Sequence, residues 1–361
     1  SVSIGPASTH RGICSGVTAS QAAACARLGS PFMERLLTLC GTRLHPGHPV
    51  TDRLANWPGD ATALGDAVAL RFTGALHALV LMGRDPALTA AYPPNSVDDD
   101  TLWSAVEDAM TRHEGHVMHW LDSAPQTNEV RRSTAMITAT QILAARFPGL
   151  PFRVSELGAS AGLNLFFDRY ALALPDGTTR GATDPVITLS PQWTGPLPPA
   201  AEVRISDRRG VDLNPLSPDD PEARLRLKSY TWPDQPDRLA RLDAALAIAR
   251  PVVDRGDAGE WLAARLAHPQ PDMIDLVYHT IAWQYFPPAT DAACRAALEA
   301  AGARATPDAP LAHLWVEAEE PRQPAVVRLF LWPGTGRKET LDLGEMNPHG
   351  LTFTARTGAS A

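Results

Sequence analysis

The sequence predicts an α/β protein in which an all-helical domain precedes a mostly parallel sheet. Three observations support this prediction. Apolar residues recur with helical spacing from about residue 18 to 146, without a convincing strand. After residue 151, short apolar runs alternate with helical segments, which implies a parallel sheet. Two apolar runs near the end flank the turn 333–338 and predict an antiparallel hairpin. The expected domains are therefore residues 1–148 and 149–361.

Three segments of the first domain have the clearest helical character, namely residues 67–81, 101–121 and 132–147. The second helix has an acidic start at residues 98–100, which suits the positive end of a helix dipole. The third is ended by Pro148 and Gly149. We expect this domain to cover the substrate side of the sheet.

The second domain reads as five strand–helix steps followed by the hairpin. The segment 163–172 is expected to be the first helix of this domain, and the proline-rich stretch 173–205 is expected to be an irregular insertion. The expected strands are 153–156, a short strand ending at 212, 252–253, 273–278, 314–317, 326–332 and 340–343.

Composition narrows the possible functions. The chain has 361 residues and a net charge of −8, without a run of basic residues, which argues against a nucleic-acid partner. Neither of the two lysines, Lys228 and Lys338, lies in a phosphate-loop motif. The four cysteines form no C-x-x-C pair, so reduced thiols are expected. No signal peptide or membrane span is visible, and we expect a cytoplasmic protein with a small-molecule substrate and no membrane partner; the oligomeric state stays open.

The most informative segment is residues 152–165. A β-prone run ends in Glu156, a turn of small residues follows from Gly158 to Gly162, and a helical pattern comes next. A strand, tight turn and helix in this order present backbone N–H groups to a nucleotide-like ligand. The same letters also contain G-x-S-x-G, the nucleophile elbow of serine hydrolases, centred on Ser160.

Acidic residues follow the ends of three successive expected strands, and they favour a site for S-adenosylmethionine (SAM). Glu156 ends the first strand, Asp212 ends the second, and Asp257 follows the third. The carboxyl ends of parallel strands meet at one edge of a sheet, where ligands bind. A carboxylate at the second position can accept both ribose hydroxyls, and one after the third can accept the adenine amino group.

The segment Glu156–Gly162 resembles the E/D-x-G-x-G-x-G signature of Rossmann-like SAM-dependent methyltransferases, with Ser160 in place of the middle glycine. The chain also resembles a bacterial family known as domain of unknown function 2332, which has no established activity. The segments that carry this second resemblance are residues 126–132, 156–165 with 168–170, 210–216, 232–235 and 256–257. The first resemblance implies a SAM-methyltransferase-type sheet, with SAM as cofactor. The implied cofactor-binding residues are Glu156, Gly158, Ser160, Gly162, Asn164, Asp212 and Asp257.

Two alternatives to a methyltransferase stay open. A serine hydrolase would use Ser160 with Asp257 or Asp275 and with His279 or His313. The helical character of the upstream region and the lack of a His-Gly-Gly run disfavour this alternative. The other alternative is a non-catalytic protein of the same fold that binds a ligand or a partner.

Two groups of residues are expected on the substrate side. His279 and Thr280 follow the fourth strand, where His279 is either a general base or a buried, hydrogen-bonded histidine. The second group forms a dense polar cluster, which either caps the site or starts the following helix. It consists of Gln126, Asn128, Glu129 and Arg132.

The spacing of His113, His116 and His119 on an expected helix can present two imidazoles to one metal ion. However, Glu114 lies in H-E-x-H rather than H-E-x-x-H, and no second cluster of ligands accompanies it. A helix face without a metal is therefore favoured.

Overall fold

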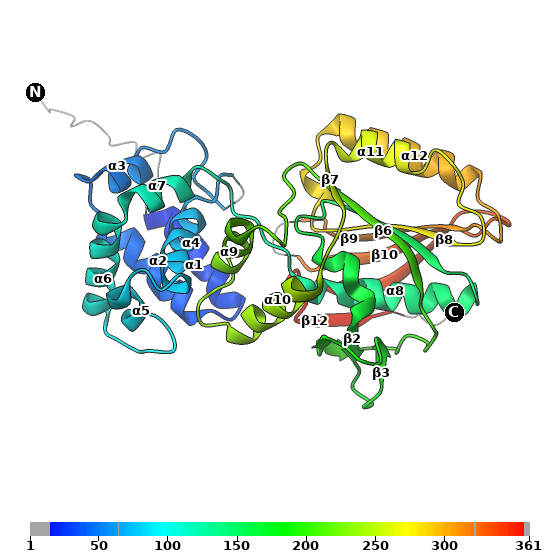
Figure 1. Cartoon of the computed structure of the whole chain (residues 1–361), viewed down its shortest axis with the longest axis horizontal. Coiled ribbons are helices and arrows are strands. Elements are labelled where there is room, and N and C mark those ends of the chain that lie inside the picture. Colours follow the sequence, from blue (N-terminus) through cyan, green and yellow to red (C-terminus); the bar gives the residue numbers. More distant parts are fainter. Residues whose placement is uncertain (1–14, 64, 321–322, 357–361) are drawn as a thin grey trace, which may run out of the picture. The chain divides into compact units, whose positions relative to one another are not determined.

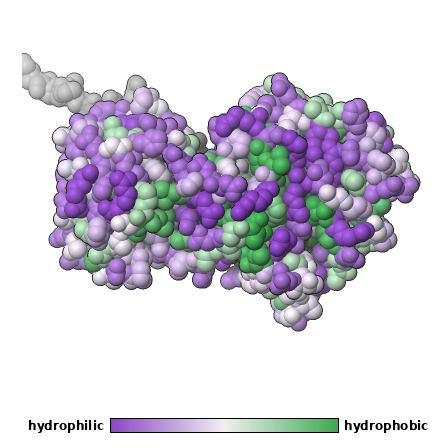
Figure 2. Space-filling view, viewed as in Figure 1, coloured by the Kyte–Doolittle hydropathy of each residue, from purple (hydrophilic) through white to green (hydrophobic). Residues whose placement is uncertain are grey.

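The structure is a computed structural model, and it describes residues 15–63, 65–320 and 323–356. By its internal contacts the chain divides into two compact units. The first unit comprises residues up to Thr127 together with Pro221–Ala240, and the second comprises Asn128–Asp220 and Arg241–Ala361. The contacts of residues 128–148 therefore place this segment in the same unit as the sheet. Hydrophilic side chains cover much of the visible face of each unit, interrupted by apolar patches (Figure 2).

The first unit is built from helices. They are α1 (Ser15–Arg27), α2 (Pro31–Arg43), α3 (Pro49–Ala55), α4 (Val68–Leu81), α5 (Pro86–Ala91), α6 (Asp99–Arg112), α7 (Glu114–Leu121) and α9 (Pro221–Ser229). The central helix α4 is buried along nearly its whole length. Gly74 of α4 lets Tyr230 approach closely, and the buried His77 Nδ1 lies 3.0 Å from the Ser229 carbonyl oxygen. These contacts explain why residues 221–240 pack with helices far away in the sequence.

The expected helix over 101–121 is interrupted, and that prediction was wrong. Asp98 starts α6 by accepting a 2.8 Å hydrogen bond from Thr101 N, in keeping with the expected acidic start. The helix then ends at His113, whose φ of −119° is not helical, and α7 begins at Glu114. A short side-chain pattern cannot reveal such a break, because both helices present apolar faces to the same core.

The second unit contains a nine-stranded sheet with the order β5-β12-β11-β10-β9-β8-β1-β6-β7. Its strands are β1 (Phe152–Leu157), β5 (Gln192–Thr194), β6 (Ile205–Asp212), β7 (Val253–Arg255), β8 (Ile274–Thr280), β9 (Leu311–Ala318), β10 (Ala325–Trp332), β11 (Glu339–Met346) and β12 (Thr352–Ala355). The strands β7, β6, β1, β8 and β9 are mutually parallel, and β10 and β11 are antiparallel to their neighbours. The predicted mostly parallel sheet and its closing antiparallel pair are confirmed.

Helices lie against both faces of this sheet. Figure 1 shows α11 (Ala258–Arg265) and α12 (Pro288–Ala303) along one face and α8 (Ser133–Arg146) on the other. The helix α10 (Pro236–Ile248) starts in the first unit and ends in the second.

In the described part of the chain, no helix combines the length and apolar character needed to cross a membrane. Cys25, Cys40 and Cys294 are buried free thiols, while Cys14 lies outside the described residues.

Two expectations for residues 163–205 were wrong. The segment expected to be a helix instead forms a 3-10 helix, η2 (Leu163–Arg169), with non-helical backbone at Phe166, and from Tyr170 it continues as a strand. The expected irregular insertion contains strands. A small sheet has the order β3-β2-β4, from β2 (Tyr170–Ala173), β3 (Thr179–Gly181) and β4 (Ile187–Leu189), while β5 joins the edge of the large sheet. The strands β3, β4 and β5 are only three residues long and fit between prolines, which are tolerated at strand ends.

The order of the sheet reverses at β1, which has β6 on one side and β8 on the other. Among the strands nearest β1, β6 and β7 come earlier in the chain and lie on one side, while β8 and β9 come later and lie on the other side. Such a reversal leaves room for a ligand beyond the carboxyl ends of the strands. The fold therefore directs attention to the residues that follow Leu157.

Candidate functional site at the carboxyl end of the central strand

The turn after β1 has an unusual backbone. Gly158, Ser160 and Gly162 have φ values of +66°, +52° and +72°, all in the left-handed region. The two glycines also pack closely, because a Cβ at Gly158 would lie 2.5 Å from Ala282 Cβ and one at Gly162 would lie 2.6 Å from Pro251 Cβ. Ser160 adopts the same conformation with a side chain, and such strain is most often found at functional sites.

Hydrogen bonds tie this turn to the end of β6. Ala159 N donates to the Val211 carbonyl oxygen at 3.0 Å, and Ser160 N donates to Asp212 Oδ2 at 2.9 Å. Asp212 Oδ1 accepts a second backbone N–H, from Asn214, at 2.8 Å. Asp212 therefore positions the turn, although each carboxylate oxygen retains a lone pair for a further donor.

Two polar groups, one near the end of β1 and one in the turn, are buried without partners among the described residues. Glu156 is 2% exposed and its Oε2 accepts no hydrogen bond, and Ser160 Oγ is in the same situation. Burial, and then the nearby charge of Asp212, raise the pKa of Glu156 well above its ordinary value, while Arg132 acts in the opposite direction. Buried polar groups without partners are uncommon in folded proteins, and each requires an explanation.

Part of the predicted substrate-side cluster packs against the turn. Asn128 Oδ1 accepts a 3.0 Å hydrogen bond from Leu163 N, at the start of η2. Asn164 donates through Nδ2 to the Glu129 carbonyl oxygen at 3.1 Å and accepts from Ser133 Oγ at 2.5 Å. These amides therefore join the start of α8 to the glycine turn.

Arg132 connects the same region to the end of β8. Its Nε donates to the Pro348 carbonyl oxygen at 2.8 Å, and its Nη1 lies 3.4 Å from the carbonyl oxygen of the buried Thr280. Of the four residues in the predicted cluster, Asn128, Glu129 and Arg132 belong to the second unit and Gln126 belongs to the first. The predicted substrate contacts of these residues, and of Thr280, stay predictions.

Asp257 has a local structural role at the start of α11. Its Oδ1 accepts hydrogen bonds from Gly259 N at 2.9 Å and Glu260 N at 3.3 Å. Its Oδ2 accepts from Thr290 Oγ1 at 2.5 Å, which is the main cause of its lowered pKa. This is the geometry of a helix N-cap, so contact between Asp257 and an adenine amino group stays a prediction.

His279 is completely buried and uses both ring nitrogens. Its Nδ1 lies 2.6 Å from Glu317 Oε1, and its Nε2 lies 2.8 Å from His313 Nε2. Glu317 Oε1 also accepts the backbone N–H groups of Ala282 and Trp283, at 3.0 and 2.9 Å. Of the two expectations for His279, this geometry matches a buried, hydrogen-bonded histidine. Sequence reasoning missed Glu317, although it too is an acid near the end of a buried parallel strand.

The structure brings no histidine to Ser160, because Ser160 Oγ has no hydrogen-bond partner among the described residues. Asp275, one of the acids considered for a hydrolase, pairs with Arg153 near the start of β1. It therefore lies at the opposite end of the parallel strands from Ser160. A preformed Ser-His-acid triad around Ser160 is not present in the described part of the chain.

The three histidines considered as metal ligands, His113, His116 and His119, bind separate partners. Nε2 of His113 lies 3.2 Å from Asp85 Oδ2, and Nε2 of His116 lies 2.8 Å from the Ala75 carbonyl oxygen. Nε2 of His119 lies 3.1 Å from the exposed Glu222. The described residues contain no group of three or more His, Cys, Asp or Glu side chains arranged to hold a metal ion.

Together, the reversal of the sheet at β1 and the strained turn that follows define an α/β protein with a candidate ligand site at the carboxyl edge of its sheet. The family described as "uncharacterized protein conserved in bacteria (DUF2332)" matches residues 17–354, so the chain belongs to this family. A search of curated proteins found no match.

Proposed function

We propose that this protein is a SAM-dependent methyltransferase that acts on a small-molecule acceptor, with SAM at the turn after β1. One observation carries the proposal: Glu156 Oε2, near the end of β1, and Ser160 Oγ, in the left-handed turn that follows, are buried without partners among the described residues, at the reversal point of a parallel sheet. A ligand with both donors and acceptors would satisfy these two groups.

The residues at this edge suit the parts of SAM. The methionine half carries an ammonium group and a sulfonium, and both favour an ionised carboxylate such as that of Glu156. The ribose hydroxyls are donors, and the free lone pairs of Asp212 are acceptors. Bound SAM would supply an activated methyl group, and the protein would contribute mainly by aligning the acceptor with it.

The raised pKa of Glu156 adds a consequence for binding. The folded protein without ligand holds this carboxyl in its neutral form to unusually high pH. A cationic ligand stabilises the ionised form, so SAM binding should release a proton and tighten as the pH rises toward the pKa of Glu156. A purely apolar or anionic ligand at the turn would not show this behaviour.

Titration calorimetry with SAM and S-adenosylhomocysteine tests the proposal. We expect saturable binding to the wild-type protein, and binding at least about tenfold weaker in Glu156→Gln and in Asp212→Asn, since each loses a charge-assisted interaction. Asp342→Asn is a matched control, because Asp342 Oδ1 also accepts the N–H two residues ahead, from Gly344, on the distant strand β11. Absence of SAM binding to the wild-type protein would contradict the proposal.

A serine hydrolase is the second candidate, because Ser160 follows a parallel strand in a left-handed conformation and its Oγ is unpartnered. A fluorophosphonate probe distinguishes the two. Labelling that disappears in Ser160→Ala would favour the hydrolase. SAM binding without turnover across a panel of acceptors would instead favour a non-catalytic ligand-binding protein.

A further inference from the structure

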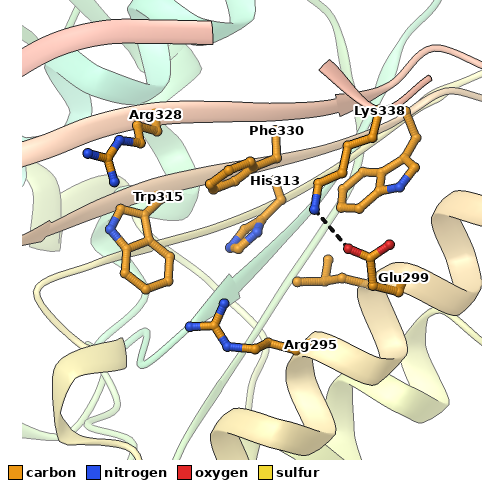
Figure 3. Close-up of a pocket in the computed structure, with 9 residues that line it drawn as sticks. Arg295, Glu299, His313, Trp315, Arg328, Phe330 and Lys338 are labelled. Atoms are coloured by element: carbon orange, nitrogen blue, oxygen red, sulfur yellow. Dashed lines mark hydrogen bonds and ion pairs between the residues drawn. The ribbon is translucent and has the colours of Figure 1, made fainter. Parts of the chain in front are cut away.

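A second candidate site lies on the face of the sheet covered by α12. A cavity of about 440 Å³ opens between β9, β10, α12 and the start of β11 (Figure 3). Three aromatic side chains, Trp315, Phe330 and Trp332, form much of its wall. Arg295, Arg328 and Lys338 also line it. A volume of this size suits a small organic ligand.

This cavity is separate from the turn after β1. The strand register places Glu156 beside Tyr278 and Tyr278 beside Leu314. His313, which lines the cavity, is the neighbour of Leu314 in the same strand. Adjacent residues of a strand point to opposite faces, so Glu156 and His313 face opposite sides of the sheet. The cavity therefore does not belong to the SAM site proposed above and does not depend on it.

Most of the groups that lack partners in this cavity are hydrogen-bond donors. Arg295 pairs with Asp291 through Nε alone, so its two terminal nitrogens bond to no described residue. In Figure 3 the Arg295 guanidinium reaches from the helix toward the space between Trp315 and His313. The indole Nε1 of Trp315 is buried without an acceptor. Arg328 pairs with Glu319 through Nη1 alone. Such a set of donors selects a ligand rich in acceptors.

Each of the three cations of the lining is paired with one acid: Arg295 with Asp291, Arg328 with Glu319 and Lys338 with Glu299. Lys338 Nζ bonds to Glu299 Oε1 at 2.8 Å, and Glu299 is the only acid among the nine lining residues, against three permanent cations. Burial, followed by the neighbouring His279 ring and the positive charges of Lys338 and Arg295, holds the pKa of His313 well below its usual value. Lys338 and Arg295 thus act electrostatically on His313, and the Arg295 donors that Asp291 does not use are available to an anionic group placed there.

The aromatic walls select a flat ligand. The ring of Phe330 lies 5.6 Å from that of His313, the Arg295 guanidinium lies 5.7 Å from the Trp315 ring centre, and Lys338 Nζ lies 4.6 Å from that of Trp332. Cations held against aromatic rings fix the orientation of both. A flat ring can stack on these walls while its acidic group meets the arginines.

Beneath the cavity, its lining residue His313 belongs to a chain of three buried side chains, with His279 and Glu317 behind it. Because Glu317 already accepts two backbone N–H groups, we assign its bond with His279 Nδ1 as a bond donated by the imidazole. A neutral His279 then accepts at Nε2 from His313 Nε2–H. His313 Nδ1, which bonds to no described residue, is left as an acceptor for the ligand. This chain fixes the His313 ring rather than leaving it free to turn.

We propose that the cavity between β9, β10 and α12 is a binding site for a planar aromatic carboxylate. The carboxylate lies against the Arg295 terminal nitrogens, and the ring lies along Trp315 and Phe330. A bidentate arginine–carboxylate contact is among the stronger polar interactions available to a protein, and it requires the geometry that a lysine cannot supply.

The test uses three probes, benzoate, 2-naphthoate and indole-3-carboxylate, each compared with its neutral carboxamide. Calorimetry on the full chain should show at least one carboxylate that binds at least about tenfold more tightly than its amide. Arg295→Gln should weaken that binding about tenfold. Arg43→Gln, which also removes a surface arginine paired with one aspartate (Asp100), should leave it unchanged. Both arginines are at least one-third exposed, so neither variant should impair folding.

A spectroscopic readout locates the probe. Trp315→Phe removes one indole N–H signal from the ¹⁵N-correlated spectrum and so assigns it, and that signal should shift when the carboxylate is added to the wild-type protein. Equal affinity for carboxylate and amide, or binding that neither shifts the Trp315 signal nor weakens in Arg295→Gln, would overturn the proposal. So would failure of all three carboxylates to bind at millimolar concentration. Binding of 2-naphthyl phosphate without any carboxylate would overturn it in favour of a phosphorylated ligand.

Discussion

The turn after β1 and the cavity beneath α12 belong to the same unit but present opposite chemistry. At the turn, the groups without partners are a carboxyl oxygen of Glu156 and the hydroxyl of Ser160. In the cavity they are N–H donors of Arg295 and Trp315. The shape of the candidate site at the turn is set by the backbone conformation of one short segment, whereas the cavity is formed by side chains from separate helices and strands. Changes at the turn should therefore affect folding and binding together, and changes in the cavity should affect binding alone.

The largest effect is expected where the backbone and packing constraints coincide. Gly162→Ala places a methyl group 2.6 Å from Pro251 Cβ at a φ of +72°. Left-handed backbone costs a residue with a side chain about 1–2 kcal/mol, and overpacking costs about 1–3 kcal/mol. The free energy of unfolding should therefore fall by about 2–5 kcal/mol, measured by urea denaturation.

Gly149→Ala is the control for this variant. Gly149 has a similar φ of +86°, but a Cβ there would meet nothing within 4 Å. It should lose only the backbone contribution, about 1–2 kcal/mol. Equal losses at the two positions would mean that the close packing of the turn does not matter, and the proposed difference between the turn and the cavity would fail.

One substitution near the cavity should lower the free energy of unfolding, namely a change at the buried Glu317. Glu317→Gln replaces an oxygen with an NH₂ group where Ala282 N already donates, so two donors face each other. Leaving buried polar groups unsatisfied costs about 1–3 kcal/mol, and the unfolding free energy should fall by that amount. Glu319→Gln, two residues further along and about half exposed, should change it by less than about 1 kcal/mol. Similar effects of both changes would show that the Glu317–His279–His313 chain does not stabilise the fold.

The sequence predicted those strands and helices that carry a clear pattern within their own residues, and it missed those that depend on pairing with distant segments. Three strands of the parallel core, β1, β8 and β9, are mostly buried runs of the kind that a sequence pattern detects, and Glu156 and Asp212 lie at or next to the ends of β1 and β6, close to where they were predicted. The strands β5 and β12 were missed, because three or four residues carry too little pattern and their pairing joins segments about 160 residues apart. The segment 163–172 has apolar spacing but lacks helical backbone at Phe166.

The candidate site was predicted as a set of residues but not as a set of bonds. Sequence reasoning placed Asp212 near the turn, but only the structure shows that it accepts the Ser160 N–H. His279 was identified without Glu317, because their contact spans 38 positions and follows no motif. The cavity was not predicted at all, since its residues come from separate elements and share no spacing.

A pH series tests the buried carboxyl at the turn. Because the pKa of Glu156 is raised in the folded state, that state keeps its proton above the ordinary value of 4.5 while the unfolded chain loses it. The unfolding free energy should therefore fall as the pH rises from about 4.5 through the folded-state pKa, and the carboxyl should cost nothing below that range.

Glu156→Gln stays neutral and removes this dependence. Its stability relative to the wild-type protein should increase as the pH rises from 4.5 to 8, measured by urea denaturation at fixed ionic strength. Glu319→Gln again provides the exposed comparison, and its difference from the wild-type protein should not rise in this way. A constant difference for Glu156→Gln would mean that the carboxyl is already ionised and paired in the folded state.

The smallest change in stability is expected at the rim of the cavity, where it separates folding from binding most clearly. Arg328 pairs with Glu319 in a solvent-exposed contact, and such pairs contribute about 0–1 kcal/mol. Arg328→Gln should therefore leave the unfolding free energy nearly unchanged but weaken the binding of an aromatic carboxylate severalfold, because a cation of the lining is lost. High salt should reduce the difference in affinity between this variant and the wild-type protein. If the variant instead loses several kcal/mol of unfolding free energy and binds the carboxylate normally, Arg328 stabilises the fold rather than binding a ligand. That result would contradict the proposed difference between the cavity and the turn.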